Sequence, residues 1–205
     1  MNMRATATDT PTLLKLLDSA QQLMLTKGFP ATTVEEICES AGVTKGSFFH
    51  YFAGKEEIGA AVLDHFVTGR MQAVHGAPFQ RYRDPLKRVY GYVDFLIKMS
   101  RTPSVATGCL LGNFSLELSD THPRLRAQCG RHFDQWAEAI KHNLDEAKAR
   151  YAPKARFDTR SLAEHLIGVV EGALVLAKAK QDRKIPEQQL RHYKRYLQSL
   201  FEGDA

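Results

Sequence analysis

The sequence predicts an all-α protein. Apolar residues recur at spacings of three and four along almost every segment, which is the period of a helix with one buried face. No segment shows the alternation of polar and β-branched residues that is typical of a strand. Residues that start and stop helices, such as Thr33, Gly28 and Pro85, divide the chain into segments of helical length. We therefore expect about nine helices and no sheet.

The first part of the chain carries signals for four helices. The first helix has a leucine-rich face and ends at Lys27–Gly28, where a cation in the last turn precedes a residue suited to a left-handed cap. The second starts at Thr33, whose hydroxyl can cap it while Glu36 completes a capping box, and it closes at Gly42. The expected helices of this region are 13–27, 33–42, 45–52 and one that runs from 55 through 66.

The rest of the chain predicts a second helical unit. Pro85 opens a helix after a linker, and Pro103 and Pro123 bracket the next helical segment. A long helix then follows, and Thr159 or Ser161 begins another after a loop. The expected helices are 85–96, 108–118, 123–151, one from 159 or 161 through 179, and 186–201.

The composition excludes several classes of protein. Of 205 residues, 43% are hydrophobic and 25% charged, with 14 Gly and 8 Pro, which argues against collagen-like or broadly disordered chains. No apolar run approaches the length of a membrane span, and no secretory signal is recognisable, so we expect a cytoplasmic protein. Three cysteines cannot form a disulfide framework, which fits a reducing compartment. The net charge of +5 is compatible with a polyanionic partner.

The stretch from Thr33 to Lys55, TVEEICESAGVTKGSFFHYFAGK, carries the strongest functional signal. Two short helices joined by a tight turn that begins with glycine form a helix-turn-helix, whose second helix lies in the DNA major groove. The helical wheel places Phe48 and Phe52 on the inner side of this second helix. The residues on its outer side are Lys45, Gly46, Phe49 and His50. We therefore expect a helix-turn-helix at 33–52 within a DNA-binding domain over 1–57.

The residue types suggest two kinds of DNA contact. Lys45 and His50 are candidates for base edges, because both are expected to be exposed and can donate to purine acceptors. Thr33 and Lys55 stand at helix starts, where free N–H groups and the helix dipole favour a phosphate. The full set of predicted DNA contacts is Thr33, Thr44, Lys45, Gly46, Ser47, Phe49, His50, Tyr51 and Lys55.

These residues resemble the N-terminal signature of TetR-family transcriptional regulators. That signature combines a threonine, an alanine–glycine turn, the pattern G-x-[LF]-Y-x-[HY]-F and a lysine three residues on. The matching residues are Thr33, Ala41, Gly42, Gly46, Phe48, Phe49, His50, Tyr51, Phe52 and Lys55. Phe49 departs from the family tyrosine whose hydroxyl contacts a phosphate, so that contact is not expected here. The resemblance implies a homodimer on a palindromic operator, joined through its last two helices, with a ligand pocket in a regulatory domain over 58–205.

A second motif, TGCLLGN, runs from Thr107 to Asn113. A cysteine just inside a helix start lies near unpaired N–H groups, which favour a reactive thiolate. The segment is similar to that of TetR-family repressors which sense N-ethylmaleimide, quinones and reactive chlorine. That resemblance implies that Cys109 is redox-responsive and that Lys178, in a G-A-x-x-x-A-K stretch, is its partner. The motif also occurs in relatives that bind small organic or acyl ligands, so a pocket-lining Cys109 is the alternative. The candidate sensing residues are Cys109, Asn113 and Lys178.

The expected function is a repressor that is released from double-stranded operator DNA by a small-molecule inducer or by electrophile or oxidant modification of Cys109. The first alternative keeps DNA binding, with a non-covalent ligand and no redox sensing. A helical enzyme is the remote alternative, because the sequence has no G-x-S-x-G, phosphate-binding glycine loop or H-E-x-x-H motif. No catalytic residue and no cofactor are predicted. Cys129 and His132 share a helix face but lack the further ligands of a metal site, so no metal is predicted.

Overall fold

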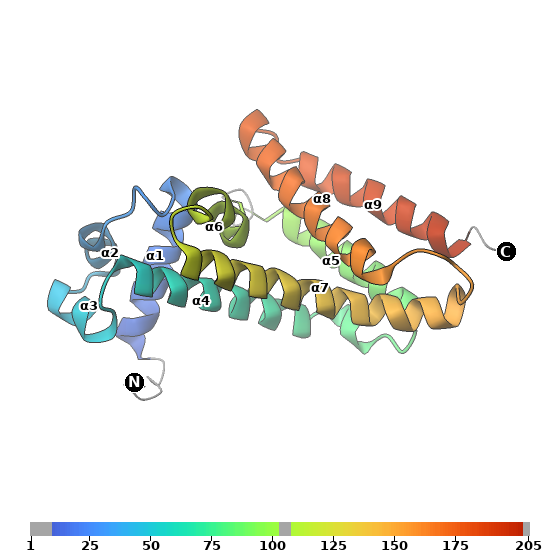
Figure 1. The fold of residues 1–205 in the computed structure, drawn as a ribbon, viewed down its shortest axis with the longest axis horizontal. Coiled ribbons are helices and arrows are strands. Elements are labelled where there is room, and N and C mark those ends of the chain that lie inside the picture. The colour runs from blue at the N-terminus through green and yellow to red at the C-terminus, as the bar shows by residue number, and fades with distance from the viewer. Residues whose placement is uncertain (1–9, 103–107, 203–205) are drawn as a thin grey trace. The chain divides into compact units, whose positions relative to one another are not determined.

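The computed structural model describes residues 10–102 and 108–202, and within them it contains helices and no strand (Figure 1). The α-helices are α1 (Pro11–Lys27), α2 (Val34–Ala41), α3 (Lys45–Tyr51), α4 (Lys55–His75), α5 (Pro85–Ser100), α6 (Leu110–Leu118), α7 (Pro123–Tyr151), α8 (Thr159–Lys180) and α9 (Ile185–Glu202). A short 3-10 helix, η1 (Pro78–Arg81), precedes α5. The predicted all-α class is confirmed.

Helix α4 runs nine residues past the predicted 66, to His75, and the other predicted helix ends agree with the structure to within a few residues. Helix α3 ends at Tyr51 because Phe52 already has extended backbone angles. The predicted linker before Pro85 includes η1. Helix α9 begins at Ile185, one residue before the predicted Pro186. Pro103 and Thr107, which belong to the predicted markers and motif near Cys109, lie outside the described residues.

The described residues pack as two compact units. Within the described residues, the first unit comprises 10–69 together with Asn113–Cys129, and the second comprises 70–102, 108–112 and 130–202. Helices α4, α6 and α7 each contribute residues to both units. The functional boundary between 57 and 58 stays a prediction, because a packing unit is not defined by what it binds.

The first unit is built around the apolar faces of α1 to α4. Leu16, Met24, Ile37, Phe48 and Ile58 are among its fully buried side chains. A polar contact joins its two chain segments, because the Gln128 side chain of α7 donates to the Ala60 carbonyl of α4 at 2.9 Å and to Asp64 Oδ1 at 2.8 Å. The segment 113–129 is therefore packed into the same unit as the helix-turn-helix.

The second unit has a core of aliphatic and aromatic side chains from α5, α7, α8 and α9. Val93, Leu144, Leu166 and Leu197 are almost completely buried in it. Tyr193 of α9 also faces this core, and its hydroxyl donates to the Leu162 carbonyl of α8 at 3.0 Å. Helices α8 and α9 are thus joined by a buried hydrogen bond as well as by apolar packing.

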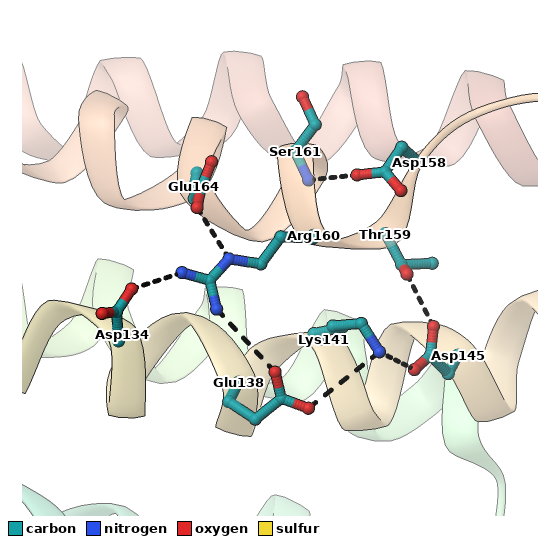
Figure 2. A network of polar contacts seen from close by, with 9 residues as sticks. All are labelled: Asp134, Glu138, Lys141, Asp145, Asp158, Thr159, Arg160, Ser161 and Glu164. Carbon is teal, nitrogen blue, oxygen red and sulfur yellow. Dashed lines mark hydrogen bonds and ion pairs between the residues drawn. The ribbon is translucent and has the colours of Figure 1, made fainter. Parts of the chain in front are cut away.

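A polar network fixes the start of α8 on α7 (Figure 2). Arg160 pairs with Asp134 at 2.6 Å and with Glu164 at 2.7 Å, and Glu138 lies 3.8 Å from it. One turn further along α7, Lys141 pairs with Asp145 at 2.6 Å, and Asp145 accepts the Thr159 hydroxyl. Asp158 caps α8 by accepting the Ser161 N–H at 2.6 Å. Shared partners hold these long side chains together better than isolated surface pairs would.

Candidate nucleic-acid interface and regulatory cysteine

Both helices of the helix-turn-helix begin with a side-chain cap. At α2, Thr33 Oγ1 accepts the Glu36 N–H at 3.2 Å while Glu36 Oε2 accepts the Thr33 N–H at 2.9 Å, so the predicted capping box is confirmed. At α3, Thr44 Oγ1 accepts the Ser47 N–H at 3.1 Å. Between them, Gly42 has φ 64°, the left-handed conformation that glycine adopts without strain. The turn from α2 to α3 is therefore short and defined at both ends.

Helix α3 has one buried side and one exposed side. Phe48 is fully buried and Phe52 nearly so, whereas Phe49 is 53% exposed. The residues on the outer side are Lys45, Gly46, Phe49 and His50, all exposed, as the helical wheel predicts. At Gly46 an added Cβ would approach only Thr44 Oγ1, at 3.7 Å, so the surface there is open. We call Lys45, Gly46, Phe49 and His50 the α3 strip.

Several predicted DNA contacts are engaged with other groups of the protein. Lys45 forms an ion pair with Glu35 of α2, both side chains being exposed. The Tyr51 hydroxyl shares a 2.8 Å hydrogen bond with Thr10 Oγ1, and Ser47 Oγ lies 3.0 Å from Thr44 Oγ1. Lys55 Nζ donates to the carbonyl oxygens of Phe29 and Pro30, each at 3.1 Å, and lies 4.7 Å from the centroid of the Phe29 ring.

The start of α2 differs electrostatically from the expectation for a phosphate site. Its first turn carries Glu35 and Glu36, and Glu36 already accepts the Thr33 N–H. Lys27, followed by the Thr33 backbone and hydroxyl, lowers the pKa of Glu36 to about 2, so this carboxylate is ionised at neutral pH. One of the free N–H groups expected at Thr33 is therefore taken by an ionised side chain.

The environment of Cys109 contradicts the expectation of an activated thiol. Cys109 lies just before the first residue of α6 and is only 8% exposed. Burial raises the pKa of the Cys109 thiol, and the nearby Glu171 carboxylate of α8 raises it further; backbone hydrogen bonds at Gly112 and Leu111 lower it less. The expected thiolate is therefore wrong for this conformation, because desolvation and a carboxylate outweigh the helix start.

The carboxylate beside Cys109 is the residue that sequence reasoning missed. An added Cβ at Gly112 would overlap Glu171 Oε2, so the small residue of the motif makes room for this side chain. Among the residues that the structure describes, Glu171 Oε1 has no hydrogen-bond partner although it is buried, and burial raises the pKa of Glu171. The available signal was a single carboxylate in the apolar stretch GVVEGALVLA, which only the fold relates to Cys109.

The other predicted sensing residues lie in different surroundings. Lys178 is exposed near the end of α8, seven residues beyond Glu171. The charged side chain that raises the pKa of the Cys109 thiol is Glu171, and the pairing of Cys109 with Lys178 stays a prediction. Asn113 is half-buried on α6.

The second unit also holds a small cavity lined by residues such as Val93, Asn143 and Tyr193, with room for about one water molecule.

Two kinds of site are absent from the part of the chain that the structure describes. Within these residues, no cluster of three histidine, cysteine or acidic side chains could hold a metal ion. The described helices include no candidate membrane span, because none combines the necessary length with the necessary hydropathy.

Comparison with known proteins identifies relatives over most of the chain. It is 28% identical over 175 residues to the HTH-type transcriptional repressor DhaR of Mycobacterium sp. (strain GP1), covering 85% of this chain and 86% of DhaR. It is 26% identical over 189 residues to the HTH-type transcriptional repressor NemR of Escherichia coli (strain K12), covering 89% and 92% of the two chains.

Solved structures give the same fold. A regulatory protein TetR from Rhodobacter sphaeroides superposes with a TM-score of 0.80 at 25% identity, over 91% of this chain and 98% of the other. The reduced form of E. coli NemR superposes with a TM-score of 0.75 at 24% identity, over 90% and 96% of the two chains.

Two family models together span most of the sequence. The model of bacterial regulatory proteins, tetR family, matches residues 16–62, which include the helix-turn-helix. The model of the tetracyclin repressor-like C-terminal domain matches residues 85–193, more than half of the chain. The chain therefore belongs to the TetR family of transcriptional regulators, which are DNA-binding proteins and not enzymes.

Proposed function

We propose that this protein is a transcriptional repressor that binds a palindromic operator as a homodimer, with α3 of each protomer in the major groove. The observation that carries the proposal is the α3 strip, an exposed cation, aromatic ring and imidazole beside a glycine, on a helix capped at Thr44. Repression is proposed because relatives such as DhaR and NemR are named repressors. The protein would act in the cytoplasm, on double-stranded operator DNA.

The hydrogen bonds and ion pairs within the protein indicate which DNA groups each side chain can contact. Lys45 and His50 face the bases or the nearest phosphates, and Gly46 lets the backbone approach the DNA. The ion pair between Lys45 and Glu35 is exposed, so a phosphate can replace Glu35 as partner at little cost. Thr33, Thr44, Ser47, Phe49 and Tyr51 are proposed to contact the DNA backbone. Two of the three N–H donors of Lys55 Nζ bind carbonyl oxygens, so Lys55 can donate only the third to a phosphate.

Replacing Lys45 by alanine should weaken DNA binding and reduce its salt dependence. Loss of one phosphate contact lowers the slope of log K against log salt by about 0.9. The matched control is Lys154→Ala, which removes the same charge from the exposed loop between α7 and α8. Fluorescence anisotropy across a salt series measures both slopes. A Lys45→Ala slope equal to that of Lys154→Ala would contradict a phosphate contact by Lys45.

The outer face of α8 supports dimerisation through the last two helices. Val175 is 53% exposed and Leu176 is 43% exposed, although both are large apolar residues. Gly168 and Gly172, two turns and one turn before Val175, are exposed and have open space at the Cβ position. Tyr196 of α9 is exposed as well. Small and apolar residues on one face let two helices approach closely and remove apolar surface from water.

The dimer is tested by placing a charge on this face. Val175→Asp should convert a dimer into a monomer in multi-angle light scattering, because a carboxylate would be buried without a partner. Leu116→Asp makes a similar change at an exposed leucine of α6 and should leave the dimer intact. A wild-type protein that is already monomeric at micromolar concentration would overturn the proposal.

Release from DNA is proposed to follow either the binding of a small inducer in the second unit or the modification of Cys109. In this conformation the cavity is too small for an organic ligand and Cys109 is buried. A ligand in this cavity, or a reagent that reaches Cys109, therefore requires the second unit to open. The Cys109 route is supported by the contact of Glu171 with Gly112, because an adduct on Cys109 could not be accommodated beside these residues.

N-ethylmaleimide separates the two routes. Cys109 should react at least about tenfold more slowly at pH 7 in the folded protein than in urea, because its thiolate is scarce when the pKa is raised. When peptide mass spectrometry shows Cys109 modified and Cys38 unmodified, wild type and Cys129→Ser should release operator DNA, whereas Cys109→Ser treated in the same way should retain it. Equal behaviour of wild type and Cys109→Ser would exclude the Cys109 route and leave the non-covalent inducer.

A further inference from the structure

Phe29, in the connection between α1 and α2, is the centre of a cluster that joins several helices of the first unit. Its side chain is 2% exposed. The ring meets those of Phe114 of α6 and His122 edge-to-face, with centroid separations of 5.4 and 5.3 Å. On α4, a Cβ added at Gly59 would lie only 2.7 Å from Phe29 Cε2, so the ring packs directly on the helix backbone.

Charged side chains hold the backbone on both sides of this residue. The Phe29 N–H donates to Glu117 Oε2 of α6 at 2.8 Å, while the carbonyl oxygens of Phe29 and Pro30 accept from Lys55 Nζ of α4. Gly28 has φ 87°, and a Cβ there would lie 2.8 Å from Glu117 Oε1. The carboxylate of Glu117 therefore lies close against this connection and accepts the hydrogen bond of the Phe29 N–H.

The same connection determines where α2 begins. Thr32 closes it, with its hydroxyl donating to the Gly28 carbonyl at 2.7 Å and its N–H donating to the Phe29 carbonyl at 3.2 Å. Thr33, the next residue, is the N-cap of α2. Because the turn to α3 is short and fixed, a shift of this connection moves α2 and α3 together.

We propose that Glu117 is a positioning residue for operator binding: its bond to the Phe29 N–H holds the connection before α2 and thereby the placement of the α3 strip. The inference rests on the proposed function and extends it to a residue that does not touch DNA. It makes the segment 113–129, distant in sequence, a working part of the DNA-reading unit.

The sign of the expected effect separates this role from simple electrostatics. Removing a carboxylate from a protein that binds a polyanion should strengthen binding or leave it unchanged. Glu117→Ala should instead weaken binding by about tenfold, because part of the reading surface must then be ordered on association. The salt slope should stay that of wild type, since no phosphate contact is lost.

The test compares Glu117→Ala with Glu117→Gln and Asp120→Ala. Glutamine keeps an acceptor oxygen, and Asp120 is an exposed carboxylate just beyond α6. The DNA probe is a duplex that the wild-type protein selects from a random-sequence pool. Amide hydrogen exchange at Phe29 reports the bond itself, and the Ile37 amide, which donates to the Thr33 carbonyl, reports the integrity of α2.

In Glu117→Ala, exchange at Phe29 should be at least about tenfold faster while Ile37 is unchanged, because a hydrogen bond to a charged group is lost. Operator affinity should fall in that variant, remain close to wild type in Glu117→Gln, and not fall in Asp120→Ala. If exchange at Ile37 is also faster in Glu117→Ala, the test passes to Glu117→Asp, which keeps the charge on a shorter side chain. That variant must then show both faster exchange at Phe29 and weaker operator binding.

Two results would overturn the inference. One is Glu117→Ala binding that matches Asp120→Ala. The other is a loss of affinity without faster exchange at Phe29. If the wild-type protein selects no duplex at all, the proposed function fails and the inference fails with it. If wild type selects a duplex and Glu117→Ala binds it with wild-type affinity, the role of Glu117 is excluded while the proposed function stands.

Discussion

Helices of eight and seven residues do not persist in water unless their ends are capped and one face is buried, and α2 and α3 meet both conditions. The capping box at Thr33 and the cap at Thr44 satisfy the first N–H groups, and Gly42 turns the chain between them. Phe48 anchors α3 in the core. With its inner side fixed in this way, α3 can leave Lys45 and His50 exposed without losing its position.

The net charge contributes little to the case for DNA binding. Residues 1–55 contain five Lys or Arg and five Asp or Glu, which balance to zero, whereas residues 148–195 contain twelve basic and five acidic residues. The excess of +7 thus lies in the part of the chain assigned to regulation. The helix-turn-helix itself brings Glu35 beside Lys45 and Glu36 beside Thr33. Recognition therefore depends on a few placed side chains of α3, and less on a general attraction to a polyanion.

Sequence reasoning succeeded where the determining residues are neighbours in the chain. The capping box, the Gly42 turn, the helix started by Pro85 and the two sides of α3 all depend on contacts within a few residues. It failed at Cys109, where the helix start was a local argument and the deciding group, Glu171, lies on another helix. Lys55 is similar, because the carbonyl groups that it contacts belong to residues 29 and 30.

Selection of DNA from a random pool by wild type and His50→Ala shows whether the exposed side of α3 reads base pairs. Wild type should select a palindrome with half-sites about one helical turn apart. His50→Ala should select the same spacing with a relaxed preference at one symmetric pair of base positions. Identical sequences for both proteins would exclude His50 as a base contact. If no palindrome is enriched, α3 does not read base pairs as a symmetric pair of helices.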